Sequence, residues 1–351
     1  MEPSLIKGRR LGVKAFRDGD ILVTEEGMIF YAFGDVHPKD RAMAYLKYVP
    51  KALAPRFPIT FQTTEWVMGE QTLVRPASLF TPENYQRILD TFTRHFPDYV
   101  YADPYCGKTL IAVPAHKIAR ISWPGEALKT LLASAHLDRL QSVARTLVTL
   151  LSRSSHVSLT EFGLHGSLAL GTHTYFSDID LSVYGGHNFR MVRESVGRLV
   201  GEGVVTYLVE DAVDELRRNK GVFQGKKFVV NALRKREEIR EHYGQHRYHA
   251  LRPLHFTAKI VDDREAPFKP AVYGITDYRP LDAASSLPRG REPTRLVSMN
   301  SRYRGVARNQ QGVEATGTYE QVREVEGRSV EYRVVVGSAA PGREEYLWPV
   351  G

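Results

Sequence analysis

The feature that most constrains this 351-residue sequence is Gly166-Ser167 followed, after ten residues, by Asp178-Ile179-Asp180. Apolar residues flank both halves, which predicts a strand over 161–165, a glycine-containing connection, and a second strand over 179–184. Side chains alternate along a strand, so two aspartates one residue apart point to the same face. The spacing therefore predicts two carboxylates placed to share a metal ion.

The chemistry expected of this pattern is phosphate binding next to a hard cation. Mg²⁺, or Mn²⁺ in its place, prefers carboxylate oxygen and keeps sites for water and for substrate phosphates. Two such ions about 4 Å apart stabilise the attacking and leaving oxygens of a displacement at phosphorus. Gly166 lets the backbone approach a phosphate, Ser167 offers a hydroxyl and an N–H, and Ser177 caps or orients the turn before the aspartates.

The run Leu164-His165-Gly166-Ser167, followed by Ser177-Asp178-Ile179-Asp180-Leu181, resembles the DNA polymerase β-type nucleotidyltransferase superfamily. The resemblance covers fewer than about thirty residues. The wider chain, with Gly34-Asp35-Val36-His37-Pro38, resembles an uncharacterised archaeal group of such proteins. The resemblance implies a Gly-Ser loop that grips a nucleoside triphosphate, an Asp pair that binds metal, and a third carboxylate on a neighbouring strand.

The third carboxylate is the point at which the sequence departs from that pattern. The strand predicted over 227–233 carries Asn231 where an acidic residue is expected. Asparagine is not a base, so Asn231 either orients a metal-bound water or an acceptor hydroxyl, or only satisfies backbone groups. Glu210 or Asp211, after the strand predicted over 204–209, would then supply the missing charge.

Positive charge is concentrated in residues 217–240. This segment has nine basic and two acidic residues and so accounts for +7 of the net charge of +8. The basic residues are Arg217, Arg218, Lys220, Lys226, Lys227, Arg234, Lys235, Arg236 and Arg240. One interpretation is contact with the phosphates of a triphosphate or of an RNA or DNA acceptor, with Lys226 and Lys227 at the nucleotide. The other is a solvated helix face with Arg236 and Arg240 paired to Glu237 or Glu238.

The pattern of elements predicts an α+β fold of three domains. Residues 1–120 read as an N-terminal α+β domain with a hairpin over 28–33 and 42–48. Residues 121–250 read as a nucleotidyltransferase core of mixed sheet and helices, with a long helix over 124–151 and another over 189–200 capped by Asn188. Residues 251–351 read as a small β-barrel of the OB type, with strands over 314–319 and 330–336.

Aromatic side chains of the C-terminal region leave two interpretations open: a surface for stacking nucleic-acid bases, or core and hairpin pairs. They are Tyr303, Tyr319, Tyr332, Tyr346 and Trp348.

The rest of the composition favours a cytoplasmic protein. Cys106 is the lone cysteine, which excludes an internal disulfide and fits a reducing compartment. Residues 1–10 lack the apolar stretch of a signal peptide, and no run of eighteen apolar residues indicates a membrane span. Nothing in the sequence indicates an oligomeric state.

Together these features predict a metal-dependent enzyme that moves a nucleoside monophosphate from an NTP to a hydroxyl or phosphate acceptor, RNA among the candidates, and releases pyrophosphate. The alternative is a catalytically impaired relative that binds a nucleotide or RNA. Asn231 in place of a carboxylate is the reason for keeping it.

Overall fold

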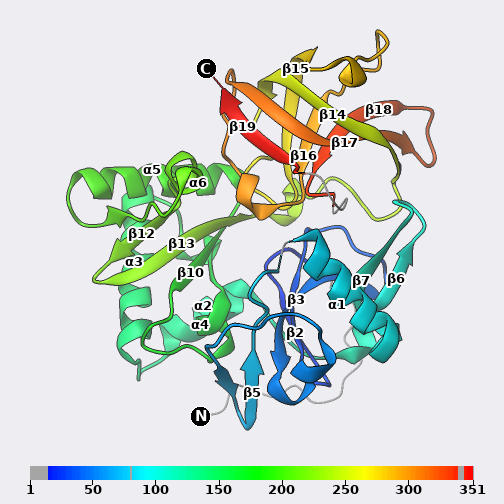
Figure 1. The fold of residues 1–351 in the computed structure, drawn as a ribbon. Coiled ribbons are helices and arrows are strands. Elements are labelled where there is room, and N and C mark those ends of the chain that lie inside the picture. The colour runs from blue at the N-terminus through cyan, green and yellow to red at the C-terminus, as the bar shows by residue number, and fades with distance from the viewer. Residues whose placement is uncertain (1–14, 80, 339–343, 351) are drawn as a thin grey trace.

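Three lobes, each built around its own sheet, make up the computed structural model, which describes residues 15–79, 81–338 and 344–350 (Figure 1). The α+β class expected from the sequence is confirmed. Residues 1–10, which bear on the expected location, lie outside the described residues. Within the described part of the chain, no helix has both the length and the apolar character needed to span a membrane.

The first lobe is an antiparallel sheet with one helix, α1 (Pro82–His95), against its core. Its strands are β1 (Ile21–Thr24), β2 (Ile29–Ala32), β3 (Arg41–Pro50), β4 (Trp66–Met68), β5 (Gln71–Val74), β6 (Val100–Asp103), β7 (Lys108–Pro114) and β8 (Ile118–Ser122). The hairpin expected over 28–33 and 42–48 is present as β2 and β3, with Phe30 opposite Leu46. Aromatic packing holds the core, since Phe30 contacts both Phe92 and Tyr99.

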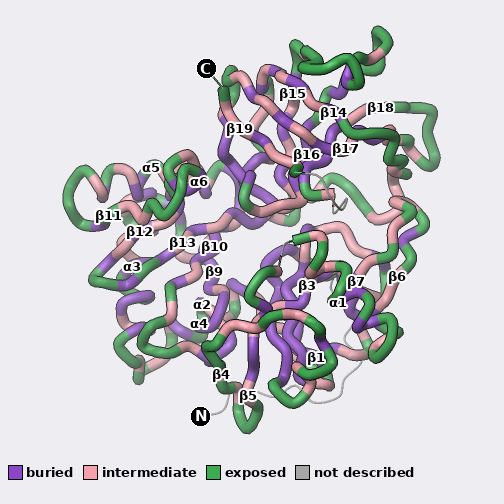
Figure 2. Tube along the Cα trace, in the orientation of Figure 1, coloured by how far each residue is buried: buried purple, intermediate pink, exposed green. Residues whose placement is uncertain are grey.

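The second lobe is a five-stranded sheet in the order β11-β12-β13-β10-β9. The strands are β9 (Phe162–Leu164), β10 (Ile179–Tyr184), β11 (Thr206–Tyr207), β12 (Lys220–Phe223) and β13 (Lys226–Leu233), and β10 runs parallel to β13. The helices are α2 (Pro124–Ala133), α3 (Arg139–Ser155), α4 (Gly166–Leu170), α5 (Gly186–Gly201) and α6 (Ala212–Arg217). Alternate residues of β10 and β13 share one apolar cluster with α2, α3 and α5 (Figure 2). The other face therefore presents Asp180 and Asn231 away from these helices.

Three expectations for this lobe are wrong in detail. The long helix over 124–151 is two helices, because Asp138 forms a capping box with Gln141 and starts α3 anew. Asn188 is not the cap of α5: the helix starts one turn earlier after Gly185, and the Asn188 side chain donates to Tyr184 O instead. The strand expected over 204–209 is only the two residues of β11.

The third lobe is a small barrel closed by five strands in the order β14-β15-β16-β18-β17-β14, with β16 parallel to β18. Its strands are β14 (His246–Asp262), β15 (Ala271–Pro280), β16 (Arg295–Ser298), β17 (Gly312–Glu324), β18 (Val330–Val336) and β19 (Tyr346–Val350), the last paired to β17. The barrel expectation is confirmed. All five aromatic residues in question lie in or against its apolar core, which favours the packing interpretation.

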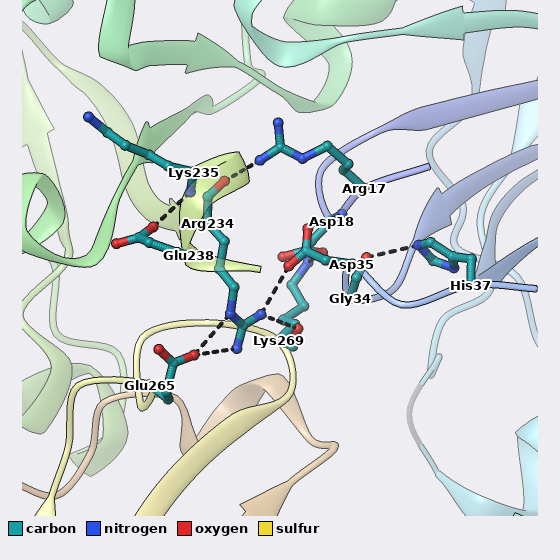
Figure 3. Close-up of polar contacts among 10 residues, drawn as sticks. All are labelled: Arg17, Asp18, Gly34, Asp35, His37, Arg234, Lys235, Glu238, Glu265 and Lys269. Carbon is teal, nitrogen blue, oxygen red and sulfur yellow. Dashed lines mark hydrogen bonds and ion pairs between the residues drawn. The ribbon is translucent and has the colours of Figure 1, made fainter. Parts of the chain in front are cut away.

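Ion pairs hold the three lobes together (Figure 3). Arg234, just after β13, binds Asp35 of the first lobe at 3.0 Å and Glu265 of the third at 2.9 Å. Lys269 of the third lobe binds Asp18 of the first at 3.0 Å. The segment 34–38 noted in the sequence is thus part of a junction between lobes. Domain limits at 120 and 250 stay a prediction.

Candidate active site

Gly166 lies directly against the second aspartate. It has φ of 66°, and a Cβ added there would lie 2.0 Å from Asp180 Oδ2. The His165 N–H donates to the Asp180 carbonyl at 2.8 Å, which fixes the turn before α4 to the start of β10. Ser167 follows in the first turn of α4 and is buried. The structure therefore brings together Gly166, Ser167 and Asp180, as the spacing predicts.

The two aspartates differ in surroundings. Asp178 is exposed at the end of the loop before β10, and Asp180 is half-buried on the strand. Although its side chain reaches solvent, partial desolvation, aided by Glu210, raises the pKa of Asp178 above the ordinary value, against the pull of Lys227 and Lys220. Burial also raises the pKa of Asp180, aided by Asp178 and opposed by Lys47. Because both carboxyl groups resist ionisation, a cation bound between them would stabilise their charged forms.

The first lobe contributes cationic and aromatic residues that no pattern in the sequence groups with Asp180. Lys47 on β3 and Arg75 after β5 both lower the pKa of Asp180. Lys47 Nζ lies 5.3 Å from the centre of the Tyr31 ring, and Tyr31 packs edge-on against His165 at 4.6 Å. Burial lowers the pKa of Lys47 to about 7. The site therefore lies between the first and second lobes.

Within the described part of the chain, two polar atoms beside this site are buried and have no hydrogen-bond partner. They are Arg75 Nε and His165 Nε2. Burial lowers the pKa of His165 to about 3, so its ring is neutral near pH 7. An unpaired guanidinium N–H in such a place is a donor ready for an anion. Mg²⁺ in proteins is often held by one or two carboxylates together with substrate phosphates. The residues here fit such a metal-bound triphosphate: they offer two carboxylates, the close Gly166 turn and the free N–H of Arg75.

The third carboxylate has no counterpart on β13. Val229 pairs with Asp180, and Asn231 pairs with Ser182 two residues further along. Asn231 Oδ1 accepts from Arg304 Nη2 of the third lobe at 2.8 Å. Among the described residues, no three His, Cys, Asp or Glu side chains gather as a metal site.

The two acidic residues proposed as substitutes are already engaged. Glu210 raises the pKa of Asp178 and so lies near it, but its carboxylate binds Lys227 at 2.9 Å. Asp211 caps α6 and pairs with Arg302 at 2.9 Å.

The remaining predicted nucleotide-binding residues surround the loop before β10. Ser177 Oγ accepts from Thr174 N at 2.9 Å and so shapes that loop. Lys226 is buried, donates to Tyr175 O, and places its ammonium 3.4 Å from the centre of the Tyr175 ring. Lys227 is exposed on β13 beside Glu210.

The basic segment 217–240 does not form one surface. Lys220 binds Asp214 at 2.7 Å, Lys235 binds Glu161 at 3.0 Å, and Arg234 lies in the lobe junction. The predicted pairing of Arg236 and Arg240 is not present, because Glu238 accepts from backbone N–H groups instead. Most of this charge serves contacts within and between lobes.

Comparison with known proteins agrees with the position of this site. Residues 145–249 match a family model described as a nucleotidyltransferase domain. The chain is 25% identical over 350 residues to the uncharacterised protein MJ1086 of Methanocaldococcus jannaschii, a match that covers 93% of this chain and 97% of that protein. No solved structure matches.

Proposed function

Residues 145–249 are a nucleotidyltransferase domain, and from this premise we propose that the protein transfers a nucleoside monophosphate from an NTP to an acceptor in a metal-dependent reaction. The observation that carries the proposal is the contact of the Gly166 turn with Asp180, where a Cβ would lie 2.0 Å from Oδ2. A phosphate bound to the backbone there lies next to the carboxylates that hold the metal.

Each residue of the site has a role in this proposal. Asp178 and Asp180 hold Mg²⁺ or Mn²⁺, which when bound supplies charge stabilisation to the transferring phosphoryl group. The Ser167 hydroxyl and N–H bind the triphosphate. Lys47 and Arg75 reach the same phosphates from the first lobe, and Arg75 Nε, which has no hydrogen-bond partner among the described residues, is the free donor.

We propose that the acceptor is a nucleic acid, with RNA as the first candidate. Phe176 is 88% exposed and Tyr175 53% exposed in the loop just before Asp178. Lys226 and Arg139 lie over the Tyr175 ring. Exposed aromatic rings with cations beside them stack nucleobases and contact phosphates with little regard to sequence. The lobe that follows is a small closed barrel, a form that OB-like nucleic-acid binders share.

The test is transfer of label from α-³²P-labelled NTPs, with Mg²⁺ or Mn²⁺, to RNA, DNA and small hydroxyl acceptors. We expect transfer by the natural chain and a loss of at least about 100-fold in Asp178→Asn and Asp180→Asn. Asp138→Asn, which keeps the α3 cap, is the matched control and retains activity. Absence of transfer with every NTP and acceptor, in folded protein, contradicts the proposal.

One observation favours the alternative of a nucleotide- or RNA-binding protein without turnover. The β13 residue paired with Asp180 is Val229, and Asn231 is held by Arg304. If this alternative holds, the protein binds NTP but forms no product with any divalent metal ion. Equilibrium binding of a fluorescent NTP, measured beside the transfer assay, separates the two functions.

A further inference from the structure

A second concentration of positive charge lies between the second and third lobes, away from the Gly166 turn. A groove of about 660 Å³ runs between α5, α6 and the end of β19. Figure 1 shows these helices on the side of the second lobe that faces β19. Its charged lining residues are Arg193, Arg217, Arg218, Arg308, Glu194 and Glu215. This volume is in the range of pockets that hold small metabolites and cofactors.

Two of the arginines are unpaired. Among the described residues, Arg193 and Arg217 make no ion pair and no side-chain hydrogen bond, in contrast to Arg308, which donates to Leu216 O at 3.2 Å. Two acidic groups of α6 are engaged elsewhere, Asp214 by Lys220 and Asp211 by Arg302. Glu194 and Glu215 line the groove beside four arginines, so the charges of its lining side chains sum to +2. Burying a guanidinium group without a partner carboxylate costs free energy unless a bound anion balances its charge.

The neighbours of these two side chains increase the need for an anion. Burial, then the charge of Arg304, lowers the pKa of Arg217 to about 9, against the pull of Asp214 and Asp211. Burial, then Arg308 and Arg190, lowers the pKa of Arg193 to about 10, against the pull of Asp263 and Glu194.

Arg193 and Arg217 also line a separate small recess, together with Asn219, Asn231 and Arg304. The recess has about 10 Å³, room for one water molecule, and carries no acidic side chain. The buried Asn219 Oδ1 has no hydrogen-bond partner among the residues that the structure describes. A buried acceptor without a donor marks a place where a water or a ligand hydroxyl completes the structure.

Aromatic surface lies in the same groove as the free arginines. Tyr207 and Trp348 both line it. Arg218 lies 5.8 Å from the centre of the Tyr207 ring, and Trp348 packs edge-on against Tyr303 at 6.0 Å. Arginines that bind phosphate beside aromatic rings that stack a base are the chemistry that recognises a nucleotide.

We propose that the groove between α5, α6 and β19 is a second nucleotide site, in which Arg193 and Arg217 bind the phosphate of a mononucleotide and Tyr207 and Trp348 contact its base. The proposal does not depend on transfer at the Asp178–Asp180 site. The residues that line the groove are not among those placed at that site; Asn231, bonded to Arg304, lines only the recess.

The test is isothermal titration of AMP, ribose 5-phosphate and inorganic phosphate into full-length protein carrying Asp178→Asn and Asp180→Asn, without divalent metal. Metal-dependent binding at the candidate active site is thereby removed. We expect saturable AMP binding, with an affinity at least about tenfold lower in Arg193→Gln and in Arg217→Gln. We also expect ribose 5-phosphate, which lacks the base, to bind more weakly than AMP. Arg153→Gln, an exposed arginine on α3, is the matched control and leaves the affinity unchanged.

Folding is checked by thermal unfolding without ligand. Since Arg217 is crowded by Arg304, we expect Arg217→Gln to melt no lower than the natural chain, and AMP to raise the melting temperature only where both arginines remain. Equal AMP affinity in all variants overturns the proposal. So does equal affinity for AMP and ribose 5-phosphate, or binding of a dodecaribonucleotide at this groove with no binding of AMP.

Discussion

At the scale of single residues, Gly166 carries the sharpest prediction. In Gly166→Ala the methyl group meets Asp180 Oδ2, and φ of 66° adds about 1 kcal/mol of backbone strain. We expect nucleotidyl transfer to fall at least about 100-fold because the carboxylate that we propose as a metal ligand is displaced. Gly171→Ala is the control: it has φ of 72° with nothing within 4 Å of the added Cβ. Similar losses of transfer in both variants contradict a specific role for the Gly166–Asp180 contact.

Asp20 gives a prediction for pH. Burial raises its pKa from 3.8 to about 7, helped by Asp18 and Asp35 and opposed by Arg17. The folded state holds the proton of Asp20 more tightly than the unfolded state does. The carboxyl therefore has no effect on the free energy of unfolding below about pH 4 and lowers it progressively as the pH rises to about 7. The full loss is about 4 kcal/mol, at ~1.4 kcal/mol per pKa unit. Asp20→Asn keeps an acceptor for Arg17 N–H, which now bonds Oδ2 at 3.0 Å.

Urea unfolding of both proteins between pH 4 and 8 checks this expectation. The advantage of Asp20→Asn over the natural chain should grow with pH up to about 7 and then level off. A difference in free energy of unfolding that does not vary with pH contradicts it.

The sequence predicts some residues of the site and misses others for a physical reason. Gly166 and Asp180 are fourteen positions apart in a strand–turn–strand unit, and local geometry alone brings them together. Lys47 and Arg75 come from a different sheet, so only tertiary packing places them beside Asp180. The signal in the sequence that could have identified Lys47 is that it is the single lysine in the aromatic strand β3.

At the scale of elements, the loop between α4 and β10 has a testable role. Phe176→Ala removes a ring that is 88% exposed, so the free energy of unfolding should change by less than about 0.5 kcal/mol. Loss of base stacking, worth about 1–3 kcal/mol, should weaken RNA binding by about 5- to 150-fold. Phe176→Trp keeps a stacking ring and retains the affinity. Fluorescence anisotropy with a short oligoribonucleotide measures both, and an unchanged affinity in Phe176→Ala removes this loop from the acceptor site.

Element types were predictable where the pattern is strong and local, as in β10, β13 and the β2–β3 hairpin. The break between α2 and α3 was missed because apolar spacing continues across it, whereas the Asp138–Gln141 capping box decides where the helix starts. Of the two interpretations of the basic segment 217–240, a single phosphate-contacting surface is disfavoured, since strand alternation and ion pairs send its side chains in different directions. Charge counted along the chain says little about charge on a surface.

At the scale of the whole molecule, the junction of the lobes positions Lys47 and Arg75 over Asp180. Arg234 binds two carboxylates there, and they differ in exposure: the Asp35 side chain is 4% exposed and that of Glu265 46%. An exposed ion pair contributes about 0–1 kcal/mol, whereas removing one partner of a buried pair costs about 3–5 kcal/mol. One arginine therefore offers a matched comparison of both cases.

We expect Asp35→Asn to lower the free energy of unfolding by about 3 kcal/mol and Glu265→Gln by less than about 1 kcal/mol, both measured by urea unfolding at pH 7. The amide oxygen introduced by Asp35→Asn still accepts from Asp18 N, which Asp35 Oδ1 now bonds at 3.2 Å. The substitution removes the buried partner of Arg234 and also the repulsion between Asp35 and Asp18, which offsets part of the loss. Asp35→Asn should also reduce nucleotidyl transfer more than Glu265→Gln, because a loosened first lobe withdraws Lys47 and Arg75 from the phosphates. Equal effects of the two substitutions would mean that burial of the pair does not hold the first lobe in place.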